Sequence, residues 1–414
     1  MGRLRVLILA FGLDGEDVGE TYSAFNWVEA LSHQAKTTVL STSRRTNRPL
    51  VEQLPQAEVI TWPEPHLLYT RAERLNAMVQ PWLPVFNRLA ARWIAAAQTG
   101  SGRREFDIAH QILPQAMRNA SPLRHFDIPY VIGPLGGGLQ TPPGFLADVG
   151  HERGFMRLRA LDHWRLRHDR ALRASYQRAA LLLGVAPYVQ KRLAKAGLGH
   201  LPFRPVLERG HGPLPDVPPR QAKPGQLRLL HVGRTIRTKA LRDTVRAMAH
   251  LRDLPGVTLV SVGDGPDLAA CRAEAEALGV IDRITFLGRI PRKQVDAEYR
   301  AADVFCFPSF REPMGGVLFE AMEWGLPVIA AARGGPDFIV DDASGIRLLV
   351  TTPNQFAHDI AGAIRKLAMD PNLRQRVGRG ARARIASFGT WDDKAVQTMA
   401  LYREILAQRE GRCA

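Results

Sequence analysis

Short apolar runs alternate with amphipathic stretches along the whole chain. In the first half, apolar runs that suit buried strands lie at 5–11, 37–42, 107–113 and 130–134, and a helical pattern lies at 21–35. A second series has strand-like runs at 227–233, 257–263, 284–290, 304–309 and 327–331, and helical stretches at 239–251, 267–280 and 315–325. Strands that alternate with helices predict parallel sheets covered by helices on both faces.

The pattern occurs twice, and a stretch rich in proline and glycine separates the two series. The chain has 414 residues, which is more than one hydrophobic core usually serves. We therefore expect an α/β protein of two doubly wound, Rossmann-like domains, with ligands in a cleft between them. The predicted parts are an N-terminal domain (1–205), a linker (206–226), a second domain (227–388) and a C-terminal helix (389–414) that packs back toward the first domain.

The composition of the chain limits the cellular compartments in which the protein is expected to lie. No apolar run approaches the ~18 residues that a membrane-spanning helix needs. The start, MGRLRVLILAFGLDGED, has the arginines and the apolar run of a signal peptide but no small-residue cleavage site, so we interpret it as a first buried strand. The three cysteines share no metal-type spacing, which favours a reducing compartment such as the cytoplasm.

The formal net charge is +16, which predicts attraction to an anionic partner such as nucleic acid, a lipid surface or a phosphorylated ligand. The charge is densest at 151–178, where eight arginines stand against three acids, a net of +5. Phe155, Leu158, Leu161 and Trp164 lie among them. The segment suits a peripheral contact with an anionic membrane, or a solvated helix that packs its leucines inward, and both interpretations stay open.

Several loops place glycine directly after a strand, where backbone N–H groups suit a phosphate. VGRTIRTKAL adds Arg234 and Lys239 to Gly233, and such cations can wrap a diphosphate, although exposed cations after a strand are common. GPLGGGLQT, with Gly136, Gly137 and Gly138, lacks the ending of a P-loop but lets a ligand approach the backbone.

REPMGGVLFEAMEWG places two glutamates, Glu312 and Glu320, on either side of a Met-Gly-Gly turn, with seven residues between them. The glycines predict that Glu312 lies on a loop before a helix and Glu320 about one turn inside it. A helical rise would separate them by on the order of 12 Å, too far to share a proton or a metal ion. The two would therefore contact different parts of one elongated ligand, such as a nucleotide-sugar, unless they are ordinary surface glutamates beside a helix start.

Together these motifs resemble a known family. HVGRTIRTK, VSVGDGPDL, the stretch from ITFLGRI to GGPDFIV, and SFGTWDDKAVQTMALYREIL occur in the order found in retaining glycosyltransferases of family 4, also called glycosyl transferases group 1. The resemblance covers almost all of 228–408, and it is looser in GETYSAFNWVEALS, FDIAHQI and IPYVIGPLGGG of the first half. It implies the GT-B fold, in which two Rossmann-like domains face each other across a cleft.

The resemblance also implies a role for each matching residue. Glu312 would bind sugar hydroxyls and Glu320 the ribose, while Arg234 and Lys239 would neutralise the diphosphate. The remaining donor-binding positions it implies are Gly19, Gly233, Arg289, Ile290, Met314, Gly315, Gly316 and Val317, with Gly136, Gly137 and Gly138 on the acceptor side. His110 matches a histidine near the reacting carbon. Ala240 and Val18 depart from the family pattern, because glycine is usual at both positions.

The implied activity is transfer of a sugar, with retention, from a nucleotide-diphosphate donor such as a UDP- or GDP-sugar. The acceptor would be a polysaccharide, a glycolipid or a lipid-linked molecule, and the enzyme would be cytoplasmic or peripheral at the inner membrane face. We expect no cofactor and no metal, because the chain has no Asp-x-Asp motif and no His/Cys cluster. Alternatives are a nucleotide-sugar epimerase of the same fold and a basic nucleic-acid-binding protein; for the latter, cations interleaved with aromatic residues are missing. The sequence does not name the sugar, the base, the acceptor or the oligomeric state.

Overall fold

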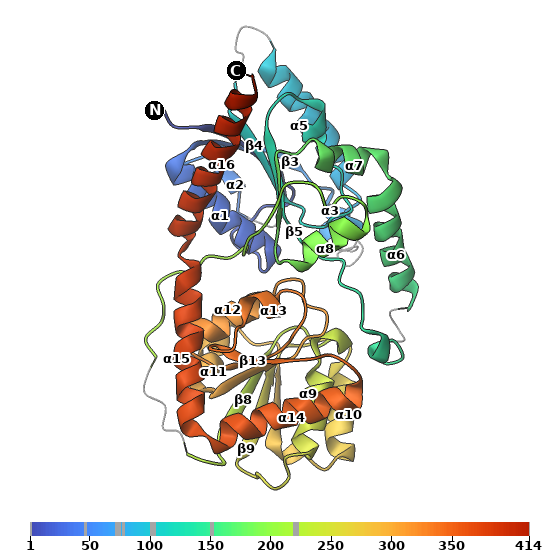
Figure 1. The fold of residues 1–414 in the computed structure, drawn as a ribbon, viewed down its shortest axis with the longest axis vertical. Coiled ribbons are helices and arrows are strands. Elements are labelled where there is room, and N and C mark those ends of the chain that lie inside the picture. The colour runs from blue at the N-terminus through green and yellow to red at the C-terminus, as the bar shows by residue number, and fades with distance from the viewer. Residues whose placement is uncertain are drawn as a thin grey trace. The chain divides into compact units, whose positions relative to one another are not determined.

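The protein is described by a computed structural model that covers residues 2–44, 48–70, 76, 79–99, 105–149, 153–217 and 223–413. The chain forms two compact units. Unit 1 comprises Met1–Gly138, Leu158–Gly210 and Gly389–Ala414, and unit 2 comprises Leu139–Arg157 and His211–Phe388. Each unit is built on one parallel sheet (Figure 1).

Unit 1 contains a seven-stranded parallel sheet in the order β3-β2-β1-β4-β5-β6-β7. Its strands are β1 (Arg5–Ala10), β2 (Lys36–Ser43), β3 (Glu58–Pro63), β4 (Ile108–Leu113), β5 (Tyr130–Leu135), β6 (Leu181–Gly184) and β7 (Phe203–Pro205). Its helices are α1 (Glu20–Gln34), α2 (Leu50–Gln53), α3 (His66–Thr70), α5 (Leu83–Gln98), α6 (Arg153–His168), which enters unit 1 at Leu158, α7 (Arg170–Gln177), α8 (Tyr188–Lys195) and α16 (Trp391–Cys413).

The last helix, α16, lies along α1 and completes the core of unit 1 (Figure 1). Ala395, Met399 and Tyr402 of α16 are buried in the same apolar cluster as the strands β1 and β4. The Trp27 Nε1–H on α1 donates a hydrogen bond of 2.9 Å to the Thr398 hydroxyl. Burial of this apolar face, rather than helix propensity, fixes the helix on unit 1.

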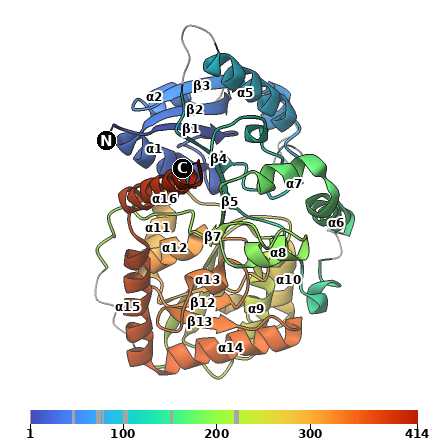
Figure 2. The same cartoon turned by 45° about the horizontal axis from the view of Figure 1, so that its top comes forward.

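Unit 2 contains a six-stranded parallel sheet in the order β10-β9-β8-β11-β12-β13. Its strands are β8 (Leu227–Val232), β9 (Val257–Val262), β10 (Ile284–Gly288), β11 (Val304–Phe307), β12 (Val328–Ala331) and β13 (Gly345–Leu348). Its helices are α9 (Leu241–Ala249), α10 (Leu268–Ala277), α11 (Arg292–Ala301), α12 (Gly316–Glu323), α13 (Pro336–Ile339), α14 (Pro353–Met369) and α15 (Pro371–Phe388). Figure 2 shows α9, α10 and α14 on one side of the sheet and α11 and α12 on the other.

The expected fold class is confirmed, because both sheets are parallel and helices alternate with strands. Four strands, β3, β6, β7 and β13, lie outside the apolar runs that predict strands. No sequence pattern indicates that Leu139–Arg157 belongs to unit 2, where Phe145 and Val149 are buried in the core. None of the helices among the described residues is both long and apolar enough to cross a membrane.

Candidate functional site

The candidate site of unit 2 lies where the strand order reverses. β8 is followed in the chain by β9 on one side of the sheet and, later, by β11 on the other. The loops after two such strands diverge at the carboxyl edge of a parallel sheet and leave a crevice for a ligand. Residues 233–240 follow β8 and residues 308–315 follow β11, so the two predicted loops meet at this reversal.

Backbone contacts join these two loops to each other. The Thr238 carbonyl accepts the Phe310 N–H at 3.1 Å and the Ser309 hydroxyl at 3.0 Å. Behind them the loop after β9 comes very close, since a Cβ on Gly263 would lie 1.9 Å from the Gly233 carbonyl oxygen. The glycines of VSVGDGPDL therefore serve close packing of loops, which agrees with the missing third glycine of a dinucleotide fingerprint.

Lys239 and Glu312 form an ion pair that bridges the two loops. The Lys239 ammonium also lies 5.3 Å from the centroid of the Phe307 ring, a favourable cation–π distance. The two side chains are only 20% and 10% exposed, so the pair is partly desolvated and held in one place. The sequence predicted a cation and a carboxylate at this site but not that they contact each other.

Glu320 lies on α12, which begins at Gly316, so it is about one turn inside the helix, as the sequence indicated. Gly315 precedes the helix with a φ of 102°, a conformation that favours glycine. The Glu320 carboxylate accepts the Tyr299 hydroxyl at 3.2 Å and pairs with Arg292 at 2.8 Å. These partners orient a carboxylate that is 12% exposed.

Two glycines after β12 support the loop that carries Glu312. Gly335 donates its N–H to the Glu312 carbonyl at 3.0 Å. A Cβ on Gly335 would lie 2.1 Å from the Met314 carbonyl oxygen, and one on Gly334 would lie 2.3 Å from the Glu312 carbonyl oxygen. Only glycine allows this approach, so Gly334 and Gly335 fix the path of the loop.

The other predicted residues of unit 2 lie on the same carboxyl edge. Arg234 is exposed directly after Gly233. Arg289 is exposed and Ile290 half-buried after β10, which is separated from β8 by β9. Met314 is buried and Val317 half-buried at the start of α12.

Arg237 is a residue of this site that the sequence did not single out. It is 6% exposed and pairs with Asp148 at 2.6 Å and with the fully buried Asp243 at 2.5 Å. Its guanidinium also lies over the rings of Phe145 and Phe310, at 5.5 and 5.4 Å. Partial burial acts to raise the pKa of Asp148, but the hydrogen bond and the charge of Arg237, together with the charges of Arg246 and Arg242, outweigh it, and the net direction is downward. Asp148 lies in the segment Leu139–Arg157, so no pattern near Arg237 in the sequence could show this anchor.

In unit 1, His110 lies in the middle of β4 with no exposed surface. Its Nδ1 is 2.6 Å from the Tyr402 hydroxyl and its Nε2 is 2.7 Å from the Gly133 carbonyl. Burial lowers the pKa of the imidazole to about 4, so the ring is neutral at physiological pH. The catalytic role of His110 stays a prediction, and this geometry favours a structural role.

The glycines predicted for unit 1 lie after strands of its sheet. Gly19, with a φ of 71°, precedes α1 and is exposed. Gly136 follows β5, and the carbonyls of Gly137 and Gly138 accept hydrogen bonds from the Tyr188 hydroxyl, at 3.2 Å, and from the Arg192 guanidinium. The loop is thus held by α8.

A buried polar cluster next to this loop was also missed. Glu208 lies in the stretch assigned to the linker, yet its carboxylate is buried and accepts a hydrogen bond from the Gln115 amide. The Gln115 carbonyl accepts the Gly136 N–H at 2.9 Å. Burial, with a smaller effect of the Glu20 charge, raises the pKa of Glu208 to about 8.

Lys394 of α16 completes this cluster. Its ammonium donates to the Leu207 carbonyl and lies 4.3 Å from the centroid of the Trp27 ring. Burial lowers the pKa of Lys394 to about 8, although the charge of Glu208 opposes the change.

The sequence comparisons with known proteins match the second unit of the chain. Residues 216–384 match the model of the family described as glycosyl transferases group 1. A D-inositol 3-phosphate glycosyltransferase of Kribbella flavida is 37% identical over 185 residues, which are 42% of this chain and 43% of that protein. The match thus spans less than half the length of this relative.

Two solved structures resemble almost the whole chain. Sucrose-phosphate synthase of Thermosynechococcus elongatus has a TM-score of 0.68 at 21% identity and covers 98% of this chain and 100% of that one. HepE of Anabaena, solved in complex with UDP, has a TM-score of 0.64 at 17% identity and covers 97% of this chain and 100% of that one. These likenesses show a GT-B fold.

Proposed function

Since residues 216–384 match the model of the glycosyl transferases group 1 family, we propose that this chain is a retaining glycosyltransferase that uses a nucleotide-diphosphate sugar. The observation that carries the proposal is the Lys239–Glu312 pair at the reversal of strand order, together with Glu320, which lies one turn inside α12. Such a row of cation and carboxylates matches the phosphate, sugar and ribose of one extended donor.

In the proposed complex the donor replaces the Lys239–Glu312 pair. The diphosphate takes the Lys239 ammonium and the exposed Arg234, and the sugar hydroxyls donate to Glu312. The ribose hydroxyls donate to Glu320, which Tyr299 and Arg292 already orient. Arg289 and Ile290 would line the base, and Met314 to Val317 would meet the sugar and phosphate with their backbone.

The chemistry follows from where charge develops. Cleavage of the bond between sugar and diphosphate builds negative charge on the leaving oxygen, and fixed cations stabilise it most when they are already in place. The Lys239 ammonium already lies in the site, close to the Phe307 ring, before the donor arrives, so that its partner changes from Glu312 to the diphosphate. We expect turnover to survive excess EDTA; loss of turnover that magnesium or manganese restores would contradict this account of the leaving group.

The acceptor is proposed to be a carbohydrate or lipid-linked molecule that meets unit 1 near Gly136, Gly137 and Gly138. Peripheral membrane contact through 151–178 would bring the enzyme to such an acceptor. Residues 151 and 152 lie outside the described part of the chain, as do the side chains up to residue 160. The described remainder of α6 exposes Leu161 and Trp164, which are 49% and 56% exposed.

Isothermal titration calorimetry with UDP, the nucleotide bound to the Anabaena protein, tests the division of roles between the two glutamates. Glu320→Gln is expected to weaken UDP binding about 10-fold, because a hydrogen bond to a charged group is lost. Glu312→Gln is expected to leave UDP affinity unchanged or slightly higher, since Lys239 loses its competing carboxylate, while turnover of the sugar donor falls. The exposed Glu276 provides the control Glu276→Gln, which should change neither. An equal loss of UDP affinity in Glu312→Gln and Glu320→Gln would overturn the assignment.

A further inference from the structure

A large pocket lies at the amino edge of the seven-stranded sheet of unit 1. It encloses about 670 Å³ and is lined by the first residues of β5, β6 and β7, by the loops that precede them and by one face of α16. Its size lies in the range of pockets that bind small molecules, roughly 300–1,000 Å³. β5 runs from Tyr130 in the pocket to Leu135, directly before Gly136. Six residues of strand span about 20 Å, so the pocket is separate from the glycine loops at the carboxyl edge.

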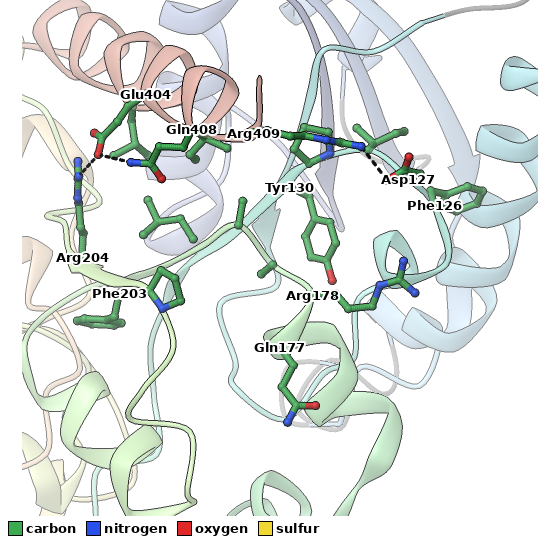
Figure 3. Close-up of a pocket in the computed structure, with 18 residues that line it drawn as sticks. Phe126, Asp127, Tyr130, Gln177, Arg178, Phe203, Arg204, Glu404, Gln408 and Arg409 are labelled. Carbon is green, nitrogen blue, oxygen red and sulfur yellow. Dashed lines mark hydrogen bonds and ion pairs between the residues drawn. The ribbon is translucent and has the colours of Figure 1, made fainter. Parts of the chain in front are cut away.

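The charges in the pocket leave one arginine uncompensated. Arg204 pairs with Glu404 at 2.6 Å, and Arg409 pairs with Asp127 at 2.8 Å. Figure 3 shows these two pairs at separate ends of the pocket, with Arg178 in neither. Arg178 is exposed, and no carboxylate among the described residues forms an ion pair with it. Three arginines and two carboxylates give the lining a formal charge of +1.

The positive field of Arg178 reaches its neighbours. After desolvation, the charges of Arg124 and Arg178 are the causes that lower the pKa of His125. The same two arginines act on the buried Tyr130, whose hydroxyl donates to the Ser175 carbonyl at 2.7 Å. An anion at this wall would therefore meet a guanidinium fork that is free to give two parallel hydrogen bonds.

The other residues that line the pocket suit a ligand that carries hydroxyl groups. Gln177 and Gln408 bring amide groups that can donate to and accept from hydroxyls, and Phe203 brings an aromatic ring. Leu401 and Ile405 add apolar surface from α16. We propose that this pocket binds a phosphorylated monosaccharide, with the phosphate on Arg178 and the sugar hydroxyls on polar groups of the lining. The site is independent of the proposed donor site, which lies in unit 2.

Calorimetry on the full chain tests the proposal with glucose 6-phosphate, mannose 6-phosphate and N-acetylglucosamine 6-phosphate. At least one is expected to bind, while glucose and inorganic phosphate bind at least about 10-fold more weakly, because each supplies only half of the contacts. Arg178→Gln is expected to weaken binding about 10-fold or more. Arg403→Gln removes an exposed arginine of α16 that does not line the pocket and should leave affinity unchanged.

Saturating UDP separates this site from the donor site. The sugar phosphate is expected to bind equally well with UDP present, and equally well to Arg234→Gln. Loss of binding in either case would place the ligand at the donor site and overturn the inference. Absence of binding by all three sugar phosphates, an unchanged affinity in Arg178→Gln, or inorganic phosphate binding as tightly as the sugar phosphates would also overturn it.

Discussion

At the scale of single residues, Arg234 and Arg237 show how the structure separates roles that the sequence presents alike. Both belong to VGRTIRTKAL, three positions apart. Arg234 is exposed at the carboxyl edge of the sheet, whereas Arg237 is buried against Asp148 and Asp243. Of these two arginines, one is therefore available to a ligand and the other anchors the loop itself.

This difference predicts opposite effects of two substitutions. Arg237→Met should destabilise the protein by about 3–5 kcal/mol, because it leaves the buried Asp243 without its main partner. Arg234→Gln should change stability by less than about 0.5 kcal/mol and weaken UDP binding about 10-fold. Urea denaturation and calorimetry measure the two quantities. A stable Arg237→Met variant that binds UDP poorly would show that Arg237, too, acts on the ligand.

The Glu208 carboxyl predicts a pH dependence of stability. Burial raises its pKa from an ordinary value of 4.5 to about 8, so the folded state holds the proton more tightly than the unfolded state does. Its contribution to stability is complete below about pH 4.5 and falls as the pH rises to 8. The groups that face it are Gln115, Glu20, Arg209 and Lys394. Lys394 acts in the opposite sense, because its pKa is lowered from 10.5 to about 8 and its contribution recovers between these values.

Glu208→Gln should therefore flatten the decline between pH 5 and pH 8. Between these two values the wild type is expected to lose about 3 kcal/mol more unfolding free energy than the variant. Urea denaturation at both pH values gives the difference, and Glu276→Gln is the control at an exposed glutamate. Equal losses in the wild type and Glu208→Gln would mean that Glu208 does not titrate in this range.

At the scale of elements, the glycines that follow β12 position the loop that carries Glu312. Gly335→Ala should push the Met314 backbone aside, because its Cβ would lie 2.1 Å from the Met314 carbonyl oxygen. We expect a loss of about 1–3 kcal/mol in stability and weaker binding of the sugar donor. Gly362→Ala is the matched control in α14, where a Cβ meets nothing within 4 Å. This change should stabilise the protein by up to about 1 kcal/mol. Normal donor binding by Gly335→Ala would show that the loop tolerates displacement.

The elements also show where sequence analysis succeeds and why it stops. The strands β8 and β11 and the helix α12 follow from local apolar patterns, and the placement of Glu312 and Glu320 follows from the glycines between them. The contacts of Arg237 with Asp148 and of Glu208 with Gln115 do not follow, because these partners lie 89 and 93 residues away in the chain. A local pattern carries no information on contacts of that separation, and a proline-rich stretch gives no sign that one of its carboxylates is buried.

At the scale of the whole molecule, the net charge of +16 is the property that the fold leaves least explained. Several arginines form ion pairs within the protein. Arg165, in the segment where the positive charge is densest, pairs with Asp169 at 2.9 Å. Others, such as Arg167 and Arg170, stay exposed near Leu161 and Trp164. Cations beside exposed apolar side chains are the combination that binds the interface of an anionic membrane.

Sedimentation with liposomes tests whether this surface binds lipid. Binding is expected to vesicles that contain phosphatidylglycerol but not to pure phosphatidylcholine, and to weaken as salt rises, because the attraction is electrostatic. Arg167→Gln with Arg170→Gln should weaken it on the order of 10-fold, since each cation contributes about 1 kcal/mol. Arg376→Gln with Arg379→Gln removes the same charge from exposed positions of α15 and should weaken it less than about 2-fold, because long-range attraction is screened by salt. Trp164→Ala should weaken the binding that remains at high salt, where the apolar contact dominates. Equal sedimentation with both kinds of vesicle, or none with either, would contradict the membrane contact and make a soluble acceptor the better proposal.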